Sequence, residues 1–270
     1  MKIIVESGAT KSDWCLICPD GSTRRIKTGG INISTMPRSE VEKVISEAFA
    51  RLSITPSMVK EVHFYAAGML GNEMFEYFPY SFVECASDLL GAARALFGHE
   101  SGVAAILGTG SNCGLYDGEK IVRNFKSGGF ILGDEGSAAC LGKLFVSDFL
   151  KELVPDDIAR DFAAEFRADY PTIVANVYKG STPSAYLGSF APWIMDRYEG
   201  SAYIQQLVEQ NFRNFFVRSA GRFGDMPVGI VGGFAKSLEG IIRRIASEIG
   251  VDIREVLYSP AEQLIDFHRL

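Results

Sequence analysis

The stretch VESGATKSDWCLICPDG, residues 5–21, decides the fold. It begins as an apolar strand and breaks at small and hydroxyl residues after Glu6. It then continues as a second strand that ends at Pro19, Asp20 and Gly21. This order predicts a β-hairpin whose bend is rich in small residues. Such a bend exposes backbone N–H groups, which bind anions.

A second stretch repeats this pattern further along the chain. ILGTGS, residues 106–111, follows the same order as IVESGA, residues 4–9, and each precedes a strand that ends in an Asp-Gly turn, at residues 20–21 and 117–118. Two similar hairpins predict a duplicated chain with two related lobes. Either loop alone is better interpreted as an ordinary hairpin turn. Taken together, they favour two loops that hold a polyphosphate.

The composition limits the possible partners. The chain has 270 residues, 47% of them hydrophobic, and a net charge of −6 without a basic run, so nucleic acid and an anionic membrane are not expected partners. The apolar run at the N-terminus is too short for a signal peptide, and no run reaches the length of a membrane helix. The odd count of five cysteines agrees with a reducing compartment, and we expect a cytoplasmic protein.

Cysteine and histidine spacing predicts no metal centre. Cys15 and Cys18 point to opposite faces of the expected strand, and no second pair completes a zinc site, so both are interpreted as buried apolar residues. His63, His99 and His268 are far apart in the sequence and show no ligand spacing.

Apolar runs alternate with amphipathic segments, which predicts an α/β fold with parallel sheets that also carry an antiparallel hairpin. We expect strands at residues 2–6, 13–18, 61–66, 103–107, 112–116, 120–125 and 227–231. Apolar residues at helical spacing predict core-packing helices at residues 41–52, 158–166 and 204–216.

Two well-known phosphate-binding motifs are excluded. In the first loop Thr10 stands where a Walker A motif has the glycine before its lysine, Lys11. The second loop, residues 108–113, lacks the third glycine of the dinucleotide fingerprint. A strand is also expected after it, where that motif requires a helix.

Asp88 is a candidate catalytic residue. It precedes an expected helix, where the helix dipole favours its ionised form. An ionised aspartate can accept the proton of a substrate hydroxyl, as in kinases. Taken alone, the position is better interpreted as a helix cap.

Two further glycine-rich segments are ambiguous. In residues 128–138, Gly129 and Gly133 allow close approach of a ligand, and Asp134 and Glu135 either bind sugar-like hydroxyls or cap the helix that begins near residue 137. Residues 228–237 read as a strand, two glycines and a helix, which suits either a nucleotide or close helix–strand packing.

In this order, the segments resemble the N-acetylglucosamine kinase-like branch of the BadF/BadG/BcrA/BcrD ATPase family, within the sugar kinase, Hsp70 and actin superfamily. The resemblance covers nearly the whole chain, and GTGSNC and GDEGSA are its most specific parts. It rests on ESGATKSDW (residues 6–14), GGIN (29–32), SDLLGAARAL (87–96), GTGSNC (108–113), GGFILGDEGSA (128–138) and VGGFAKS (231–237).

The resemblance implies an α/β fold of two ribonuclease-H-like, actin-like ATPase lobes, with ATP and Mg²⁺ in the cleft between them. The N-terminal lobe would comprise residues 1–104 and 260–270, and the C-terminal lobe residues 105–259. The final segment, from residue 260, would return to the first lobe as a helix. A homodimer stays open, because no sequence pattern indicates one.

The resemblance also implies a role for each matched residue. Asp88 would be the general base on the 6-hydroxyl of an amino sugar, and Glu6 would hold Mg²⁺ through water. The matched ATP-binding positions are Ser7, Gly8, Ala9, Thr10 and Lys11, then Gly108, Thr109, Gly110 and Ser111, and by the adenosine Gly232, Gly233, Lys236 and Ser237. The matched sugar-binding positions are Asn32, Asp88, Gly129, Phe130 and Asp134.

The chain departs from the family at two positions. Glu6 replaces the usual aspartate, and its extra methylene moves the carboxylate by about 1.5 Å if the backbone stays in place. A displacement of that order can cost about a hundredfold in rate. Ala9 replaces the usual glycine or serine and removes a possible donor.

Three functions follow from the resemblance. The first is an ATP-dependent kinase that converts an amino sugar, N-acetylglucosamine above all, to its 6-phosphate. The second is a non-catalytic sugar or nucleotide sensor on the same fold, motivated by Glu6. The third is an activator ATPase of a dehydratase, whose relatives bridge two subunits with an iron–sulfur cluster. The sugar-kinase form of residues 128–134 favours the first.

Overall fold

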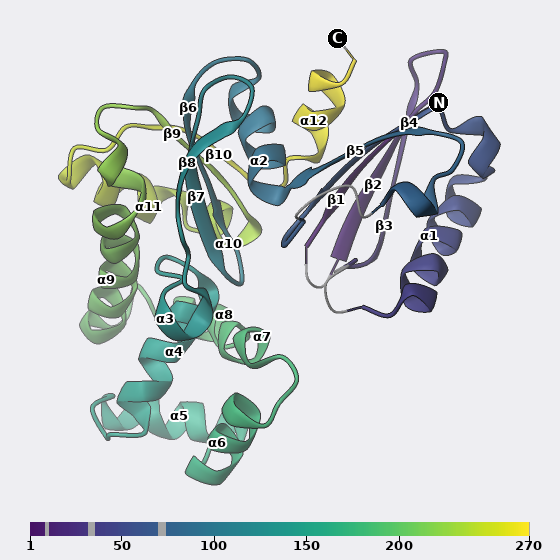
Figure 1. Ribbon diagram of the computed structural model, residues 1–270. Coiled ribbons are helices and arrows are strands. Elements are labelled where there is room, and N and C mark those ends of the chain that lie inside the picture. Colours follow the sequence, from purple (N-terminus) through teal and green to yellow (C-terminus); the bar gives the residue numbers. More distant parts are fainter. Residues whose placement is uncertain (9–10, 32–35, 70–73, 270) are drawn as a thin grey trace. The chain divides into compact units, whose positions relative to one another are not determined.

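The computed structural model describes residues 1–8, 11–31, 36–69 and 74–269 (Figure 1). The chain divides into two compact units, of which the first is Met1–Ala104, Tyr116–Val122 and Ser259–Leu270, and the second is Ala105–Leu115 and Arg123–Tyr258. The domain limits given by the resemblance stay a prediction. In the described ranges, no helix combines the length and the hydrophobicity needed to span a membrane.

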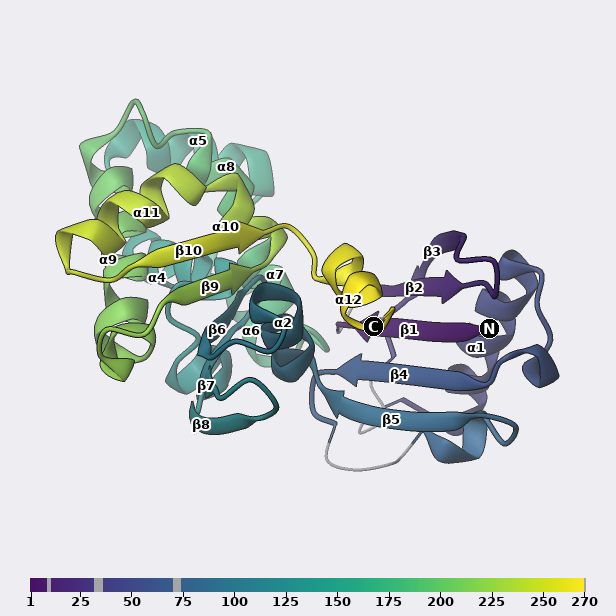
Figure 2. The ribbon, with the colours of Figure 1, turned by 90° about the horizontal axis from the view of Figure 1, so that it is seen from above.

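The first sheet has five strands in the order β3-β2-β1-β4-β5 (Figure 2). They are β1 (Lys2–Ser7), β2 (Lys11–Ile17), β3 (Thr23–Gly29), β4 (Glu61–Ala66) and β5 (Phe82–Ser87). The β1–β2 and β2–β3 pairs are antiparallel, while β4 runs parallel to both β1 and β5. The hairpin predicted from the opening stretch is therefore confirmed.

Helices cover both faces of this sheet (Figure 1). One face carries α1 (Arg38–Leu52), and the other carries α2 (Asp88–Phe97) and α12 (Ala261–Phe267). Two short 3₁₀ turns, η1 (Pro56–Met58) and η2 (Phe75–Tyr77), lie in the connections. The final segment thus folds as a helix within the first unit, as expected from the resemblance.

The second sheet repeats the order of the first. Its strands are β6 (Gly102–Leu107), β7 (Ser111–Tyr116), β8 (Ile121–Phe125), β9 (Val228–Val231) and β10 (Ile253–Leu257), arranged β10-β9-β6-β7-β8. From the hairpin side, β8-β7-β6-β9-β10 corresponds one for one to β3-β2-β1-β4-β5. A duplicated chain predicts this correspondence.

The second unit is mainly helical outside its sheet (Figure 1). Its helices are α3 (Gly129–Leu132), α4 (Ala138–Phe149), α5 (Asp156–Phe166), α6 (Tyr170–Tyr178), α7 (Pro183–Gly188), α8 (Ala191–Met195), α9 (Ala202–Arg218), α10 (Gly233–Ser237) and α11 (Glu239–Glu248), with the 3₁₀ turn η3 (Ala220–Phe223). Aromatic rings join several of them edge to face, as Phe162 does with Phe145 and Phe190. Such pairs stabilise beyond the area they bury.

Three strands, β3, β5 and β10, were not expected from the sequence. All three lie at the edge of a sheet, where a strand pairs with one neighbour only. β3, with the sequence TRRIKTG, is mostly exposed and has one large apolar side chain, Ile26. A strand that buries so little apolar surface lacks the pattern by which strands are recognised.

Candidate functional site

Two candidate carboxylates lie at the same edge of the first sheet. The strands β1, β4 and β5 run parallel, and their last residues, Ser7, Ala66 and Ser87, are in register. Glu6 is the last but one residue of β1, and Asp88 follows β5 directly as the first residue of α2. In open α/β sheets, ligands bind beyond the carboxyl ends of the strands. The register therefore places both predicted residues at the edge where a ligand is expected.

Glu6 is held in an unfavourable environment for a charge. Its pKa is raised to about 7, first because burial disfavours the ionised form and second because Asp13 and Asp88 carry like charges. The described residues donate no hydrogen bond to its carboxylate. A cation at this position would remove both the repulsion and the cost of burial.

Asp88 is not the cap of α2, which corrects the interpretation favoured for this position alone. The capping residue is Ser87, whose hydroxyl accepts a hydrogen bond from the Leu90 N–H. One Asp88 oxygen, Oδ1, accepts from the Leu89 N–H at 2.8 Å. Burial is the largest influence on the Asp88 carboxyl and raises its pKa. A carboxylate with a raised pKa accepts a proton more readily near neutral pH.

The first loop is a tight turn tied to its surroundings. The Gly8 N–H donates to the Lys11 carbonyl at 3.0 Å. The Ser7 hydroxyl is buried, lies 2.7 Å from the Ser12 hydroxyl, and accepts from the Ile31 N–H at 2.8 Å. The Ser7 side chain thus braces the loop from inside. Ala9 and Thr10 lie outside the described residues, as does the sugar-site candidate Asn32.

The second loop joins β6 to β7, so a strand follows it, and this confirms that it is not a dinucleotide fingerprint. The Gly108 N–H donates to the Gly110 carbonyl at 3.0 Å. The carbonyls of Gly108 and Thr109 accept from the Ala138 and Ala139 N–H groups at the start of α4. The loop is therefore fixed against the first turn of α4, whose N–H groups its carbonyls satisfy.

The glycine-rich segment after β8 requires its glycines. Gly128 and Gly129 have φ values of 75° and 67°, in the left-handed region that favours glycine. At Gly133 an added Cβ would lie 1.9 Å from the Ser127 carbonyl oxygen, so no side chain fits there. Phe130 lies in the short helix α3, and its carbonyl accepts from the Lys143 ammonium at 2.7 Å.

Asp134 connects this segment to the second loop. Its Oδ1 accepts from the Ser111 N–H at 3.3 Å, and its side chain is buried. Burial, as the largest influence, raises the pKa of this carboxyl. The helix α4 is capped by Ser137, whose hydroxyl accepts from the Cys140 N–H, and not by Asp134 or Glu135. The capping alternative for these two acids was therefore wrong.

The junction at the end of β9 lies beside the same loop. A Cβ added at Gly232 would come within 2.1 Å of the Leu107 carbonyl oxygen, where β6 ends. Gly233 packs on the Tyr258 ring, which an added Cβ would meet at 3.0 Å. Lys236 donates to Glu239 at 2.7 Å and to the Val256 carbonyl at 2.9 Å. The Ser237 hydroxyl donates to the Phe234 carbonyl at 2.8 Å.

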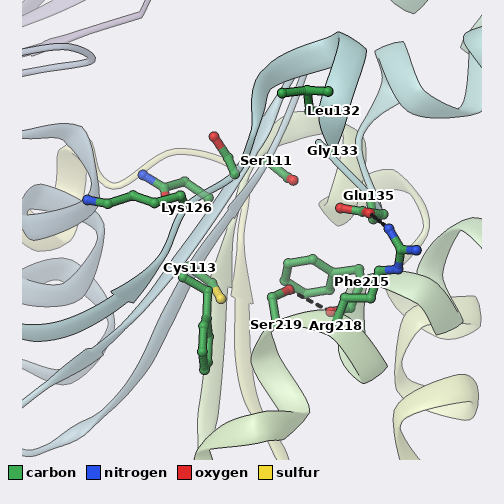
Figure 3. Close-up of a pocket in the computed structure, with 12 residues that line it drawn as sticks. Ser111, Cys113, Lys126, Leu132, Gly133, Glu135, Phe215, Arg218 and Ser219 are labelled. Atoms are coloured by element: carbon green, nitrogen blue, oxygen red, sulfur yellow. Dashed lines mark hydrogen bonds and ion pairs between the residues drawn. The ribbon is translucent and has the colours of Figure 1, made fainter.

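A pocket of about 210 Å³ opens in the second unit beside the loop and the glycine-rich segment (Figure 3). Ser111 and Leu132 lie at one end, and Phe215 and Ser219 of the α9 region at the other. Glu135 and Arg218 form an ion pair across its wall. The pocket places polar groups next to residues predicted to bind phosphate and sugar.

The sequence interpretation missed Asn211. It is fully buried in α9, where its amide oxygen accepts from the Gly136 N–H and its NH₂ group donates to the Ser137 carbonyl. It thereby anchors the GDEGSA segment to α9. The signal was present, because Asn211 interrupts the apolar stripe of Ile204, Val208 and Phe215 at helical spacing.

The oxygen donors at the edge of the first sheet suit a hard cation such as Mg²⁺, which binds one or two carboxylates together with substrate phosphates. A second group of possible ligands, His63, Glu84 and His268, does not suit a metal. Its two imidazole rings stack at 3.8 Å between centroids and 27° between planes, so their lone pairs do not converge. Glu84 is bonded to His63 at 2.7 Å and to Arg94 at 2.9 Å.

The chain matches the BadF/BadG/BcrA/BcrD ATPase family over residues 5–259. No curated protein matches it. Among solved structures it is similar to a candidate N-acetylglucosamine kinase from Porphyromonas gingivalis, at 35% identity and a TM-score of 0.91, with 99% of this chain and 98% of that chain covered.

Two more distant structures share the fold. A candidate N-acetylglucosamine kinase from Chromobacterium violaceum has 17% identity and a TM-score of 0.75, with 98% of each chain covered. A ROK family glucokinase from Streptomyces griseus, in complex with glucose and AMPPNP, has 14% identity and a TM-score of 0.61, with 98% of this chain and 97% of that one covered. The expected two-lobed, actin-like α/β fold is thus confirmed. The family match and the Porphyromonas relative show that the chain belongs to the BadF/BadG/BcrA/BcrD ATPase family.

Proposed function

We propose that the chain is an ATP-dependent kinase of an amino sugar, with N-acetylglucosamine as acceptor and its 6-phosphate as product. Membership of an ATPase family supports ATP as the donor. The name of the similar Porphyromonas gingivalis protein supports the class of sugar. The observation that carries the proposal is the Asp88 carboxylate, which lies half-buried at the carboxyl edge of the first sheet and is released from capping by Ser87.

Asp88 acts as the general base. Its carboxylate accepts the proton of the sugar 6-hydroxyl as the oxygen attacks the γ-phosphorus of ATP. One O–P bond forms, the bond between the γ-phosphorus and the bridging oxygen breaks, and ADP leaves with that oxygen. General bases of this kind contribute about 10²- to 10⁴-fold to a rate. Burial raises the pKa of Asp88 and so makes it a better base than an exposed aspartate.

Two loops would hold the phosphates. In the first unit we assign Ser7, Gly8, Ala9, Thr10 and Lys11 to the β- and γ-phosphates. In the second unit we assign the backbone of residues 108–111, which matches the second phosphate loop of the family. Glu6 would hold Mg²⁺ through water. An ion held there would supply positive charge that offsets the negative charge developing on the phosphate oxygens.

The remaining assignments follow the matched positions. Asn32, Gly129, Phe130 and Asp134 would contact the amino sugar. Gly232, Gly233, Lys236 and Ser237 would lie near the adenosine. The glycine at 232 lets the end of β9 pack against the Leu107 carbonyl of β6, so its absence of a side chain is explained by packing. The Lys236 ammonium is held by Glu239 and the Val256 carbonyl, so we assign Lys236 to shaping the site.

The test is ADP release from Mg-ATP by the purified protein against a panel of hexoses, hexosamines and N-acetylhexosamines. We expect N-acetylglucosamine to stimulate release, and phosphorus NMR of the product to place the phosphate on the 6-oxygen. A protein that binds ATP but is stimulated by none of the sugars would contradict the proposal.

Glu6 favours a second candidate, a sugar or nucleotide sensor without catalysis. An unusually long carboxylate at the metal position can misplace the ion and slow the reaction by about a hundredfold. Restoring the shorter side chain with Glu6→Asp separates the two candidates. A large gain in turnover would identify Glu6 as a lesion and favour the sensor, whereas an unchanged or lower rate would show that the glutamate is compatible with catalysis.

The cysteines do not favour the activator ATPase. A shared iron–sulfur cluster needs thiolates at a surface. Cys15, Cys113 and Cys140 are buried, and desolvation, the largest influence on each, raises their pKa values to about 11. Cys18, which was expected to be buried, and Cys85 are half-buried, but β1 and β4 lie between β2, which ends just before Cys18, and β5, which holds Cys85. An anaerobic preparation is expected to contain no iron.

A further inference from the structure

Asp13 faces Glu6 across the first hairpin. The two residues are direct partners in the antiparallel register of β1 and β2. Side chains at facing positions project from the same side of a sheet, with their Cβ atoms about 4.5–5.5 Å apart. Asp13 is only 3% exposed, yet the family resemblance gives it no role. A buried carboxylate therefore lies beside Glu6, the predicted metal-binding residue.

Like charges at facing positions destabilise a sheet, so this pair needs compensation. Arg25 on β3 supplies part of it, since its Nε donates to Asp13 Oδ1 at 2.9 Å. The same guanidinium reaches the Ser259 hydroxyl at 3.4 Å and lies 3.8 Å from Glu262. Arg25 thus fixes the position of Asp13, but it shares its single charge with other acceptors. Glu6 receives no hydrogen bond from any described residue.

The arrangement has the chemistry of a divalent-cation site. Mg²⁺ prefers oxygen ligands, keeps several waters and is bound by one or two carboxylates together with substrate phosphates. Glu6 is longer than the aspartate usual in the family and has more rotatable bonds. A second carboxylate that is rigidly held across the hairpin would fix an ion that Glu6 alone holds loosely.

We propose that Asp13, held in place by Arg25, is a second carboxylate of the Mg²⁺ site to which Glu6 contributes the first. The inference rests on the proposed function, because it concerns the ion that accompanies ATP. It predicts that Asp13 contributes to ion affinity in the absence of sugar and of turnover.

The test uses Mn²⁺ as the probe, measured by electron paramagnetic resonance in the presence of AMPPNP and without sugar. We expect Asp13→Asn to weaken Mn²⁺ binding at least tenfold and Asp13→Glu, which keeps the charge, to retain most of it. The matched control is Glu262→Gln, which removes the exposed carboxylate near Arg25 and should bind Mn²⁺ as the wild type does. Mn²⁺ affinity within twofold of wild type in Asp13→Asn would overturn the proposal, even if that variant melts at a lower temperature.

A second measurement covers the case in which Asp13→Asn does not fold. Crystals of the wild-type protein with AMPPNP and Mn²⁺ should show an anomalous peak within about 4 Å of an Asp13 oxygen, the distance of a contact through one water. A peak near Glu6 and far from Asp13 would overturn the proposal while leaving the kinase intact. No Mn²⁺ binding by the wild type with AMPPNP would overturn both this inference and the proposed function.

Discussion

The two faces of the first sheet differ in chemistry although the same strands build both. The face under α1 is apolar, with Ile3, Val5 and Phe64 fully buried. The face under α2 and α12 carries Glu6, Asp13, His63, Tyr65 and Glu84. Successive residues of a strand point to opposite faces, so Phe64 packs in the apolar core while its neighbour Tyr65 lies on the polar face.

The polar face is held together by specific bonds. Arg94 of α2 donates to Glu84 at 2.9 Å and to the Tyr65 hydroxyl at 2.6 Å, and that hydroxyl lies 2.7 Å from His268 Nε2. Among the described residues Arg94 Nε is buried without a hydrogen-bond partner, and His63 Nε2 has only the Glu61 carboxylate, at 3.5 Å. An apolar face tolerates imprecise packing, whereas each buried polar group must find its own partner. The apolar face under α1 therefore stabilises the fold, whereas the face under α2 and α12 holds charged groups in fixed positions.

The largest effect on stability is expected from the apolar face. Phe64→Ala removes a fully buried ring and should lower the free energy of unfolding by about 3–5 kcal/mol. Chemical denaturation measures this change. The control is Phe82→Ala on β5, whose ring is 65% exposed and whose loss should cost far less. Equal losses in the two variants would contradict the distinction between buried and exposed rings.

The adjacent position on the polar face should give a smaller loss. Tyr65→Phe keeps the ring but removes the hydroxyl that lies between Arg94 and His268. Leaving buried polar groups unsatisfied costs about 1–3 kcal/mol. Denaturation of Tyr65→Phe alone and combined with His268→Gln measures the coupling, which should be less than additive. Strict additivity would show that the hydroxyl and the imidazole do not interact.

The polar face should also make stability depend on pH. Burial, as the largest influence, lowers the pKa of His268 to about 3, and His63, Arg94 and Lys2 lower it further while Glu84 opposes them. Between its ordinary pKa of 6.5 and the lowered value, the unfolded chain binds the proton and the folded chain does not. Stability from this group is therefore present above pH 6.5 and lost as the pH falls.

Melting curves between about pH 7 and pH 4 test this expectation, because His268 is ordinarily titrated in that range. His268→Gln should reduce the loss of Tm on acidification. The loss due to Glu84, whose pKa is lowered to about 2 chiefly by its bond to His63, should remain at the acidic end. An unchanged slope in His268→Gln would show that the imidazole is protonated equally in both states.

The smallest effect is expected from an exposed ion pair on the outer side of α1. Arg38 bonds Glu42 at 2.9 Å and Glu76 at 2.8 Å, but its side chain is 61% exposed. Exposed pairs contribute little, because water screens the charges and ordering the side chains costs entropy. Arg38→Gln should leave Tm unchanged within error. A clear drop would show that charge pairs stabilise this sheet irrespective of burial.

Local patterns were enough to predict part of this structure. The hairpin and the second glycine-rich loop each depend on a few consecutive residues and are found as expected, while Asp88, expected just before a helix, is the first residue of α2. The edge strand β3 was missed because it buries little apolar surface. Asn211 was missed because a single polar residue within an apolar helical stripe does not reveal which backbone groups it contacts. Such features depend on tertiary context more than on propensity.

The network on the polar face could not be predicted. His63 and His268 are widely separated in sequence, and they meet because β4 and α12 pack on the same side of the sheet. Asp13 faces Glu6 through a register that one residue of slip would abolish. Spacing in the sequence reveals neither contact. The Asp13–Glu6 contact depends on the strand register, and the His63–His268 contact depends on the return of the chain to the first unit as α12.

We propose that Asp88, at the end of the polar face, has a chemical role in catalysis and not a structural one. The most direct measurement compares Asp88→Asn with the wild type in sugar-stimulated ADP release and in thermal melting on the same preparations. We expect kcat to fall at least about a hundredfold while Tm stays within about 2 °C of the wild-type value. An unchanged kcat, or a loss of activity that only follows a loss of stability, would contradict this proposal.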